Sequence, residues 1–228
     1  MTTLVLAPGL LCDAYVWQNT LAEIDTMPCH VADFSHQNSL VKMAQDTLDA
    51  VPGKLAVAGF SMGGRVALEM FRLAPERVTK LAFLDVAVTP MTPEEVAPRQ
   101  ELVRTAQSHG MQALCEAWLP NMVHPDRHGD VLMGDLKAMV LRRDPDLFAR
   151  QIEALLTRPD VSDLIRTIST PTLVLCGRQD NFSTPEMHRQ LAAALQDPTL
   201  VEIENAGHFA LVERPAPVTK ALQDWIAT

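Results

Sequence analysis

A serine at the centre of a glycine-rich segment is the residue of this chain best placed for covalent chemistry. Segment 59–64 reads GFSMGG; it follows the apolar run 55–58 and opens an amphipathic pattern typical of a helix. A tight turn between a strand and a helix strains the backbone of Ser61 and leaves room only for small neighbours. The exposed hydroxyl, with the positive end of a helix behind it, is suited to attack a carbonyl carbon. By itself the pattern is not specific, because serine and glycine are frequent in ordinary turns.

An aspartate and a histidine follow two later apolar runs. Asp180 ends the segment GRQD after the run 172–176, and His208 lies in the segment NAGHF after the run 200–203. Parallel strands end at one edge of a sheet, so both side chains can reach the crevice that holds Ser61. Each residue also has a purely structural interpretation, a helix cap for Ser61 and Asp180 and a surface position for His208. Together, however, the three residue types form a triad for acyl transfer.

The chain order serine, acid, histidine resembles that of the α/β-hydrolase superfamily, and the resemblance covers almost the whole chain. It implies a carboxylesterase-like serine hydrolase with a helical lid. Ser61 is then the nucleophile, His208 the general base and acid, and Asp180 the carboxylate that orients the imidazole. Asp85, which follows the apolar run 81–84, is the alternative acid. We favour Asp180 because its loop matches the turn of the family.

The resemblance also implies an oxyanion hole made of two backbone N–H groups. One belongs to Met62, directly after the nucleophile, and the other to the loop 7–11, with Leu10 as the expected donor. Many members of the superfamily have His-Gly in this loop, whereas this chain has Pro8-Gly9; backbone donation survives that change. A serine nucleophile excludes the alkyl-ester chemistry of haloalkane dehalogenases and epoxide hydrolases, which need a carboxylate at this position.

Short apolar runs alternate with longer helical patterns along the chain, which indicates parallel strands joined by crossover helices. The expected strands are 4–7, 29–32, 55–58, 81–84, 172–176 and 200–203, and the expected helices are 40–50, 66–73, 185–195 and 216–226. Most runs are apolar throughout, as expected when helices cover both faces of a sheet. We predict an α/β fold of the α/β-hydrolase type, with a mostly parallel sheet of about six strands flanked by helices. Since the first apolar run starts close to residue 3, we expect a reduced sheet without the antiparallel hairpin that commonly precedes the first strand in this superfamily.

The alternation stops between residues 88 and 168, where the sequence predicts several helices separated by prolines and no strand. Segment 92–95 reads TPEE, which has the composition of a helix start. An all-helical insertion between two strands of a parallel sheet is expected over the carboxyl ends of the strands, where ligands bind. We predict that residues 88–168 form a lid, and that residues 1–87 and 169–228 form the α/β-hydrolase core.

Composition and charge exclude several classes of partner. The 228 residues are 47% hydrophobic, enough for a buried core, and the net charge of −9 argues against binding to nucleic acid or to anionic membranes. No apolar run is long enough for a membrane span, and the N-terminus lacks the basic start of a signal peptide. The cysteines follow no disulfide or metal-binding pattern; they are Cys12, Cys29, Cys115 and Cys176. We therefore expect a cytoplasmic protein with no cofactor and no metal, whose partner is a small-molecule acyl substrate; the oligomeric state is not indicated.

Three residues are candidates for substrate contact. Leu11 lies in the oxyanion loop, Trp118 in the expected lid and Phe209 directly after His208. The methionine-rich lid suits an apolar acyl or alcohol group. Arg65, in the first turn after the serine, is interpreted as one half of an ion pair, but it can hold a substrate carboxylate if it faces the cleft. No cationic cluster suggests phosphate or nucleotide chemistry.

We predict a serine hydrolase that cleaves small or medium carboxylic esters through an acyl-enzyme intermediate. Thioesters and lactones stay open, because the same carbonyl chemistry serves all three. The main alternative is a carbon–carbon hydrolase or lyase, since segment 59–68, GFSMGGRVAL, also looks like the elbow of menaquinone-pathway lyases. A lid pocket rich in charged groups would favour that alternative. A third interpretation is a ligand receptor that has kept a slow hydrolase triad.

Overall fold

Six parallel strands form one sheet in the computed structural model, which describes residues 2–228. The strands are β1 (Thr2–Ala7), β2 (Cys29–Val31), β3 (Lys54–Phe60), β4 (Val78–Leu84), β5 (Thr172–Gly177) and β6 (Pro198–Ile203). Their order is β2-β1-β3-β4-β5-β6, and every neighbouring pair is parallel. The predicted fold class is confirmed. The strand order reverses direction between β1 and β3, which is where doubly wound sheets bind ligands.

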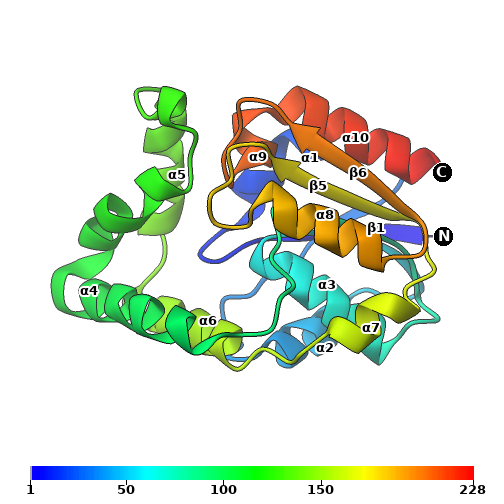
Figure 1. The fold of residues 1–228 in the computed structure, drawn as a ribbon, viewed down its shortest axis with the longest axis horizontal. Helices are drawn as coiled ribbons and strands as arrows, with labels where there is room; N and C mark the ends of the chain where they lie inside the picture. The colour runs from blue at the N-terminus through cyan, green and yellow to red at the C-terminus, as the bar shows by residue number, and fades with distance from the viewer. Residues whose placement is uncertain (1) are drawn as a thin grey trace.

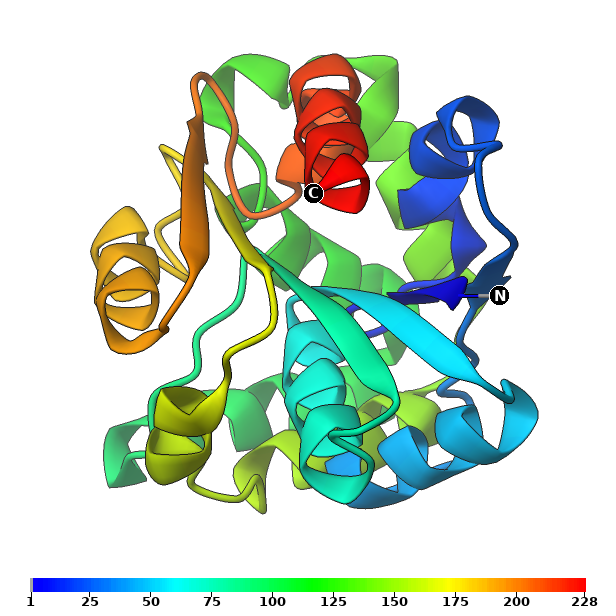
Figure 2. The ribbon, with the colours of Figure 1, turned by 90° about the vertical axis from the view of Figure 1, so that its right-hand side faces the viewer.

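Helices cover both faces of the sheet (Figures 1 and 2). One face carries η1 (Ala14–Trp17), α1 (Gln18–Glu23), α9 (Ala210–Glu213) and α10 (Pro215–Ala227); the other carries α2 (Leu40–Ala50), α3 (Met62–Leu73) and α8 (Pro185–Ala194). Along β3, alternate side chains enter opposite clusters, Ala56 on the α10 side and Val57 on the α3 side. This double cover is the physical reason for the continuous apolar runs in the sequence.

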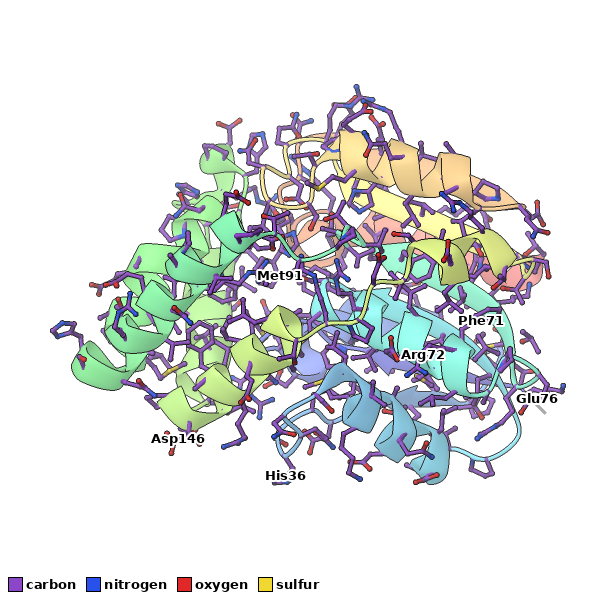
Figure 3. The ribbon with its side chains drawn as sticks, turned by 60° about the horizontal axis from the view of Figure 1, so that its bottom comes forward. His36, Phe71, Arg72, Glu76, Met91 and Asp146 are labelled. Carbon is purple, nitrogen blue, oxygen red and sulfur yellow. The ribbon has the colours of Figure 1, made fainter. Side chains whose placement is uncertain are left out.

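Between β4 and β5 the described chain forms helices and their connections. These are α4 (Pro93–Trp118), η2 (Leu119–Asn121), η3 (Pro125–Arg127), α5 (Val131–Leu141), α6 (Pro145–Leu156) and α7 (Ser162–Thr167). In Figure 1 the strands run from the side of the two termini toward α4, α5 and α6. Figure 3 shows Met91 in the connection from β4 to α4, between the insertion and the core.

The end of the insertion packs with the core. Ile165 of α7 and the adjacent Ile168 belong to the apolar cluster that also contains the buried side chains of α2, α3 and α8. The division of the chain into a core and a lid at residues 88–168 stays a prediction. So does the cytoplasmic location; within residues 2–228, no helix is long and apolar enough to cross a membrane.

Candidate active site

Ser61 occupies the turn between β3 and α3 with φ 52° and ψ −117°, a conformation that non-glycine residues rarely adopt. The flanking glycines make this turn possible. A Cβ atom on Gly59 would lie 2.4 Å from the carbonyl oxygen of Gly63, and one on Gly63 would lie 2.1 Å from the carbonyl oxygen of Ala7. The serine side chain makes no capping hydrogen bond to α3. Its hydroxyl is therefore available to the cavity in front of it.

The structure brings Ser61, His208 and Asp180 into one hydrogen-bonded chain. His208 Nε2 lies 2.8 Å from Ser61 Oγ, and His208 Nδ1 lies 2.8 Å from Asp180 Oδ2. The second oxygen of Asp180 accepts hydrogen bonds from the backbone N–H groups of Phe182 (2.7 Å) and Ser183 (2.9 Å). Both Asp180 and His208 are buried, so the carboxylate is fixed and directed at the imidazole. An ionised carboxylate only accepts hydrogen bonds, so it selects the tautomer with the proton on Nδ1 and leaves Nε2 to accept from the serine.

Asp85, the alternative acid, has a different partner. Its Oδ1 accepts a hydrogen bond from the backbone N–H of Gly177 at 2.8 Å, whereas the acid hydrogen-bonded to His208 is Asp180. Burial, followed by the negative charge of Asp180, raises the pKa of Asp85 well above its ordinary value. A carboxyl group in this environment is favoured in its neutral form.

Met62 and Leu10, the predicted oxyanion donors, both line the cavity next to Ser61. The loop of Leu10 comes close to the serine because Gly9 has no side chain; a Cβ there would lie 2.9 Å from the ring of Phe60. The next N–H in the loop, that of Leu11, donates to the side-chain oxygen of Gln151 at 2.8 Å. The N–H of Leu11 is therefore occupied, which favours Leu10 as the second donor.

The cavity has a volume of about 60 Å³. Trp118, one of the candidates for substrate contact, lines it together with Met122. The other two candidates are not part of its lining: Leu11 is 0% exposed and Phe209 1% exposed, both within the apolar core. Most other apolar residues of the insertion are also buried in that core, including Met111, Leu114 and Met139.

Three arginines also line the cavity, a cationic cluster that the sequence analysis did not identify. Arg65 comes from α3, Arg99 from α4 and Arg158 from the residues after α6. Glu95 lies between two of them, with Oε1 2.7 Å from Nη2 of Arg158 and Oε2 2.7 Å from Nη2 of Arg99. Although burial opposes it, these hydrogen bonds lower the pKa of Glu95 to about 2.

The sequence offered a signal for only one of these arginines. Arg65 stands next to the serine turn and was a candidate carboxylate-binding residue. Arg99 and Arg158 belong to segments without a motif, and only the tertiary structure brings them to the cavity. Within residues 2–228, no group of three or more histidine, cysteine, aspartate or glutamate side chains is arranged to hold a metal ion.

The parallel sheet with its serine turn and hydrogen-bonded histidine and aspartate defines a class of hydrolases. Residues 4–221 match the Alpha/beta hydrolase family, and the chain belongs to this family.

The proteins that this chain resembles include a putative carbamate hydrolase and two esterases. The chain is 28% identical over 248 residues to the putative carbamate hydrolase RutD of Pseudomonas syringae pv. syringae (strain B728a), covering 99% of this chain and 94% of that protein. It is 32% identical over 199 residues to the pimeloyl-(acyl-carrier protein) methyl ester esterase of Vibrio campbellii, covering 78% and 76%. A thermophilic esterase from Thermogutta terrifontis, solved with malate bound, has a TM-score of 0.90 and 25% identity, covering 100% of this chain and 90% of that one.

Proposed function

We propose that this protein is a serine hydrolase that cleaves small or medium carboxylic esters through an acyl-enzyme intermediate. The observation that carries the proposal is the pair of 2.8 Å contacts that link Ser61 to His208 and His208 to Asp180. The strained turn supports it, because backbone strain of this kind persists where a side chain must be held in place for function. Two of the three relatives described above are esterases by name.

In the proposed reaction, His208 Nε2 removes the proton of Ser61 Oγ as the oxygen attacks the ester carbonyl carbon. The backbone N–H groups of Met62 and Leu10 stabilise the negative oxygen of the tetrahedral intermediate. The imidazolium, stabilised by Asp180, then returns the proton to the departing alcohol. Water attacks the acyl-enzyme with His208 again acting as the base, which releases the acid and restores the serine.

Ester turnover and covalent labelling test this proposal directly. The wild-type protein is expected to hydrolyse p-nitrophenyl esters and to gain the mass of one fluorophosphonate adduct. Ser61→Ala should lose the adduct and at least about 10³-fold of the turnover, since activity left without the nucleophile comes from binding and the oxyanion hole alone. Ser162→Ala, a change of a half-buried serine at the start of α7 that does not line the cavity, is the matched control and should keep both. Full turnover in Ser61→Ala would refute the mechanism.

A carbon–carbon hydrolase or lyase is the second candidate, and the arginines at the cavity favour it. Such enzymes use the serine–histidine pair to move protons, and Arg65, Arg99 and Arg158 would suit a substrate with several carboxylates. Fluorophosphonate labelling of Ser61 without turnover of any simple ester, thioester or lactone would favour this candidate over the esterase. Both proposals include a lid, in which residues 88–168 cover the cavity.

A further inference from the structure

Arg65 is a buried cation whose charge is not neutralised by an ion pair. The residue is 5% exposed, and its Nη2 donates to the carbonyl oxygen of Thr89 at 2.5 Å. No carboxylate within residues 2–228 forms an ion pair with it, whereas Arg99 and Arg158 both pair with Glu95. Burial, followed by the charge of Arg158, lowers the pKa of Arg65. A guanidinium nevertheless keeps its proton at neutral pH, so a positive charge is held where it is unfavourable.

The remaining charges at the cavity do not balance this cation. Glu95 is the one carboxylate of the lining, and its two oxygens are already bonded to Arg99 and Arg158. Arg99 also lies over the ring of Phe182, with 5.6 Å between its guanidinium carbon and the ring centre, which keeps it at the cavity wall. Three guanidinium groups of the lining thus share one carboxylate of the lining. Asp160 also attracts Arg65, but this aspartate is exposed to solvent, lies outside the lining and forms no ion pair with it. Buried charges are normally paired, so the missing negative charge is expected to come from a ligand.

The position of Arg65 relates this missing charge to the nucleophile. Arg65 follows Ser61 by four residues and lies in the first turn of α3. Both line the same cavity. A ligand with its ester carbonyl at Ser61 can therefore place a carboxylate at Arg65 if only a short chain separates the two groups.

We propose that the cavity is an anion-binding site and that the substrate is a short-chain ester with a free carboxylate, such as the half ester of a dicarboxylic acid, with Arg65 as the carboxylate-binding residue. This inference rests on the ester hydrolysis proposed above. Water adds to the ester carbonyl, the bond between the acyl carbon and the alkoxy oxygen breaks, and the alcohol takes one proton. The second carboxylate forms with release of a proton, and no oxidant or reductant is needed.

Two esters with the same scissile bond isolate the effect of the carboxylate. Monomethyl glutarate carries one free carboxylate, and dimethyl glutarate carries a methyl ester in its place. We expect the wild-type protein to prefer the monoester in kcat/KM by at least about tenfold, the size expected of a charged hydrogen bond. Equal kcat/KM values for the two esters would overturn the proposal without the use of any variant.

Variants then assign the preference to Arg65. Arg65→Met should lower the ratio of the two kcat/KM values by about 10- to 100-fold, and Arg65→Lys should retain part of it, since it keeps the charge. Arg104→Met is the matched control, because this exposed arginine of α4 pairs with Glu101 outside the cavity. An unchanged ratio in folded Arg65→Met, or a loss of equal size in Arg104→Met, would refute the assignment.

A binding measurement separates this inference from the proposed reaction. Calorimetric titration of the Ser61→Ala protein with glutarate should detect binding at millimolar concentrations or below, weakened at least about tenfold when Arg65→Met is added. Glutarate binding without hydrolysis of any ester would keep the anion site and refute the esterase. Ester hydrolysis without glutarate binding and without preference for the monoester would refute the anion site alone.

Discussion

Two buried aspartates follow neighbouring strands of the sheet, and their surroundings give them different properties. Asp180 after β5 is hydrogen-bonded to His208 and to two backbone N–H groups. Asp85 after β4 accepts from the backbone N–H of Gly177, and burial raises its pKa. At the scale of single residues, contact with the imidazole distinguishes the two acids.

Replacement of each acid by its amide should therefore have unequal effects on activity. Asp180→Asn keeps the shape of the side chain but no longer selects the tautomer with the proton on Nδ1, so kcat should fall on the order of 10⁴-fold. Asp85→Asn should change kcat by less than about tenfold. Steady-state kinetics with one p-nitrophenyl ester compares them. A larger loss in Asp85→Asn than in Asp180→Asn would move the orienting acid to the end of β4.

Asp85 should also make stability depend on pH. Its folded-state pKa is raised above the ordinary value of 3.8, so the folded protein holds this proton at pH values where the unfolded chain has lost it. The contribution of Asp85 to the free energy of unfolding is thus present at low pH and declines as pH rises through the folded-state pKa. Asp85→Asn removes this decline.

Thermal unfolding of Asp85→Asn and the wild type, measured from about pH 5 to about pH 8, tests this effect. The difference in Tm, variant minus wild type, should become more positive as pH rises. Titrating groups that do not interact with Asp85 are common to both proteins, so their effects cancel in the difference. A difference that is constant or that decreases with pH would contradict the assignment.

At the scale of elements, backbone strain gathers where the strands end. Among residues 2–228, the non-glycine residues with positive φ are Leu11, Ser61, Asp85 and Asn205. They follow β1, β3, β4 and β6, at the sheet edge that holds the candidate site. The turn after β3 also depends on close backbone contact, since Gly63 packs directly against the carbonyl oxygens of Ala7 and Pro8.

Gly63→Ala should therefore disturb β1 and the loop with the proposed oxyanion donor Leu10. Its Cβ would lie 2.1 Å from the carbonyl oxygen of Ala7, and backbone must move to make room. We expect Tm to fall by about 3 to 10 °C and ester turnover to fall at least about tenfold. Gly134→Ala is the matched control, because nothing lies within 4 Å of its Cβ and alanine favours α5. Equal stability and activity of the two variants would contradict this interpretation of the turn.

At the scale of the whole molecule, the insertion and the histidine turn are joined by one buried side chain. Glu213 of α9 accepts hydrogen bonds from the backbone N–H of His124 in the insertion and from those of Gly207 and Phe209 on either side of the histidine. In addition, the N–H of His208 donates to the carbonyl oxygen of Met122 at 2.8 Å. The position of the imidazole is therefore coupled to that of the insertion.

Glu213→Gln should weaken this connection. Only one oxygen of the amide can accept, so the N–H of His124 or those of Gly207 and Phe209 lose their partner. A buried unsatisfied group costs about 1 to 3 kcal/mol, which for a chain of this length lowers Tm by about 2 to 12 °C. Ester kcat should fall as well. Glu204→Gln, at an exposed position, is the control; if both variants have the same Tm and kcat, the coupling is not present.

The strands, their parallel arrangement and the helical insertion could be predicted from the sequence, because they depend on local patterns. Continuous apolar runs reflect a sheet covered on both faces, and the glycines around Ser61 reflect a turn that accepts no side chain. The predicted bounds of α2, residues 40–50, agree with the structure. Ser61, Asp180 and His208 were candidates for the same reason, since each follows its own strand.

Only the tertiary structure decided which charges meet at the cavity. Arg99 lies in α4 and Arg158 in the connection after α6, both in segments without a motif, and the tertiary structure brings them to the cavity that Arg65 also lines. Likewise, Glu213 has no motif, and its three backbone partners come from two separate segments. Contacts between distant segments depend on packing rather than on local periodicity. For that reason the sequence indicated Ser61 as the proposed nucleophile, whereas only the tertiary structure determined which charges surround it.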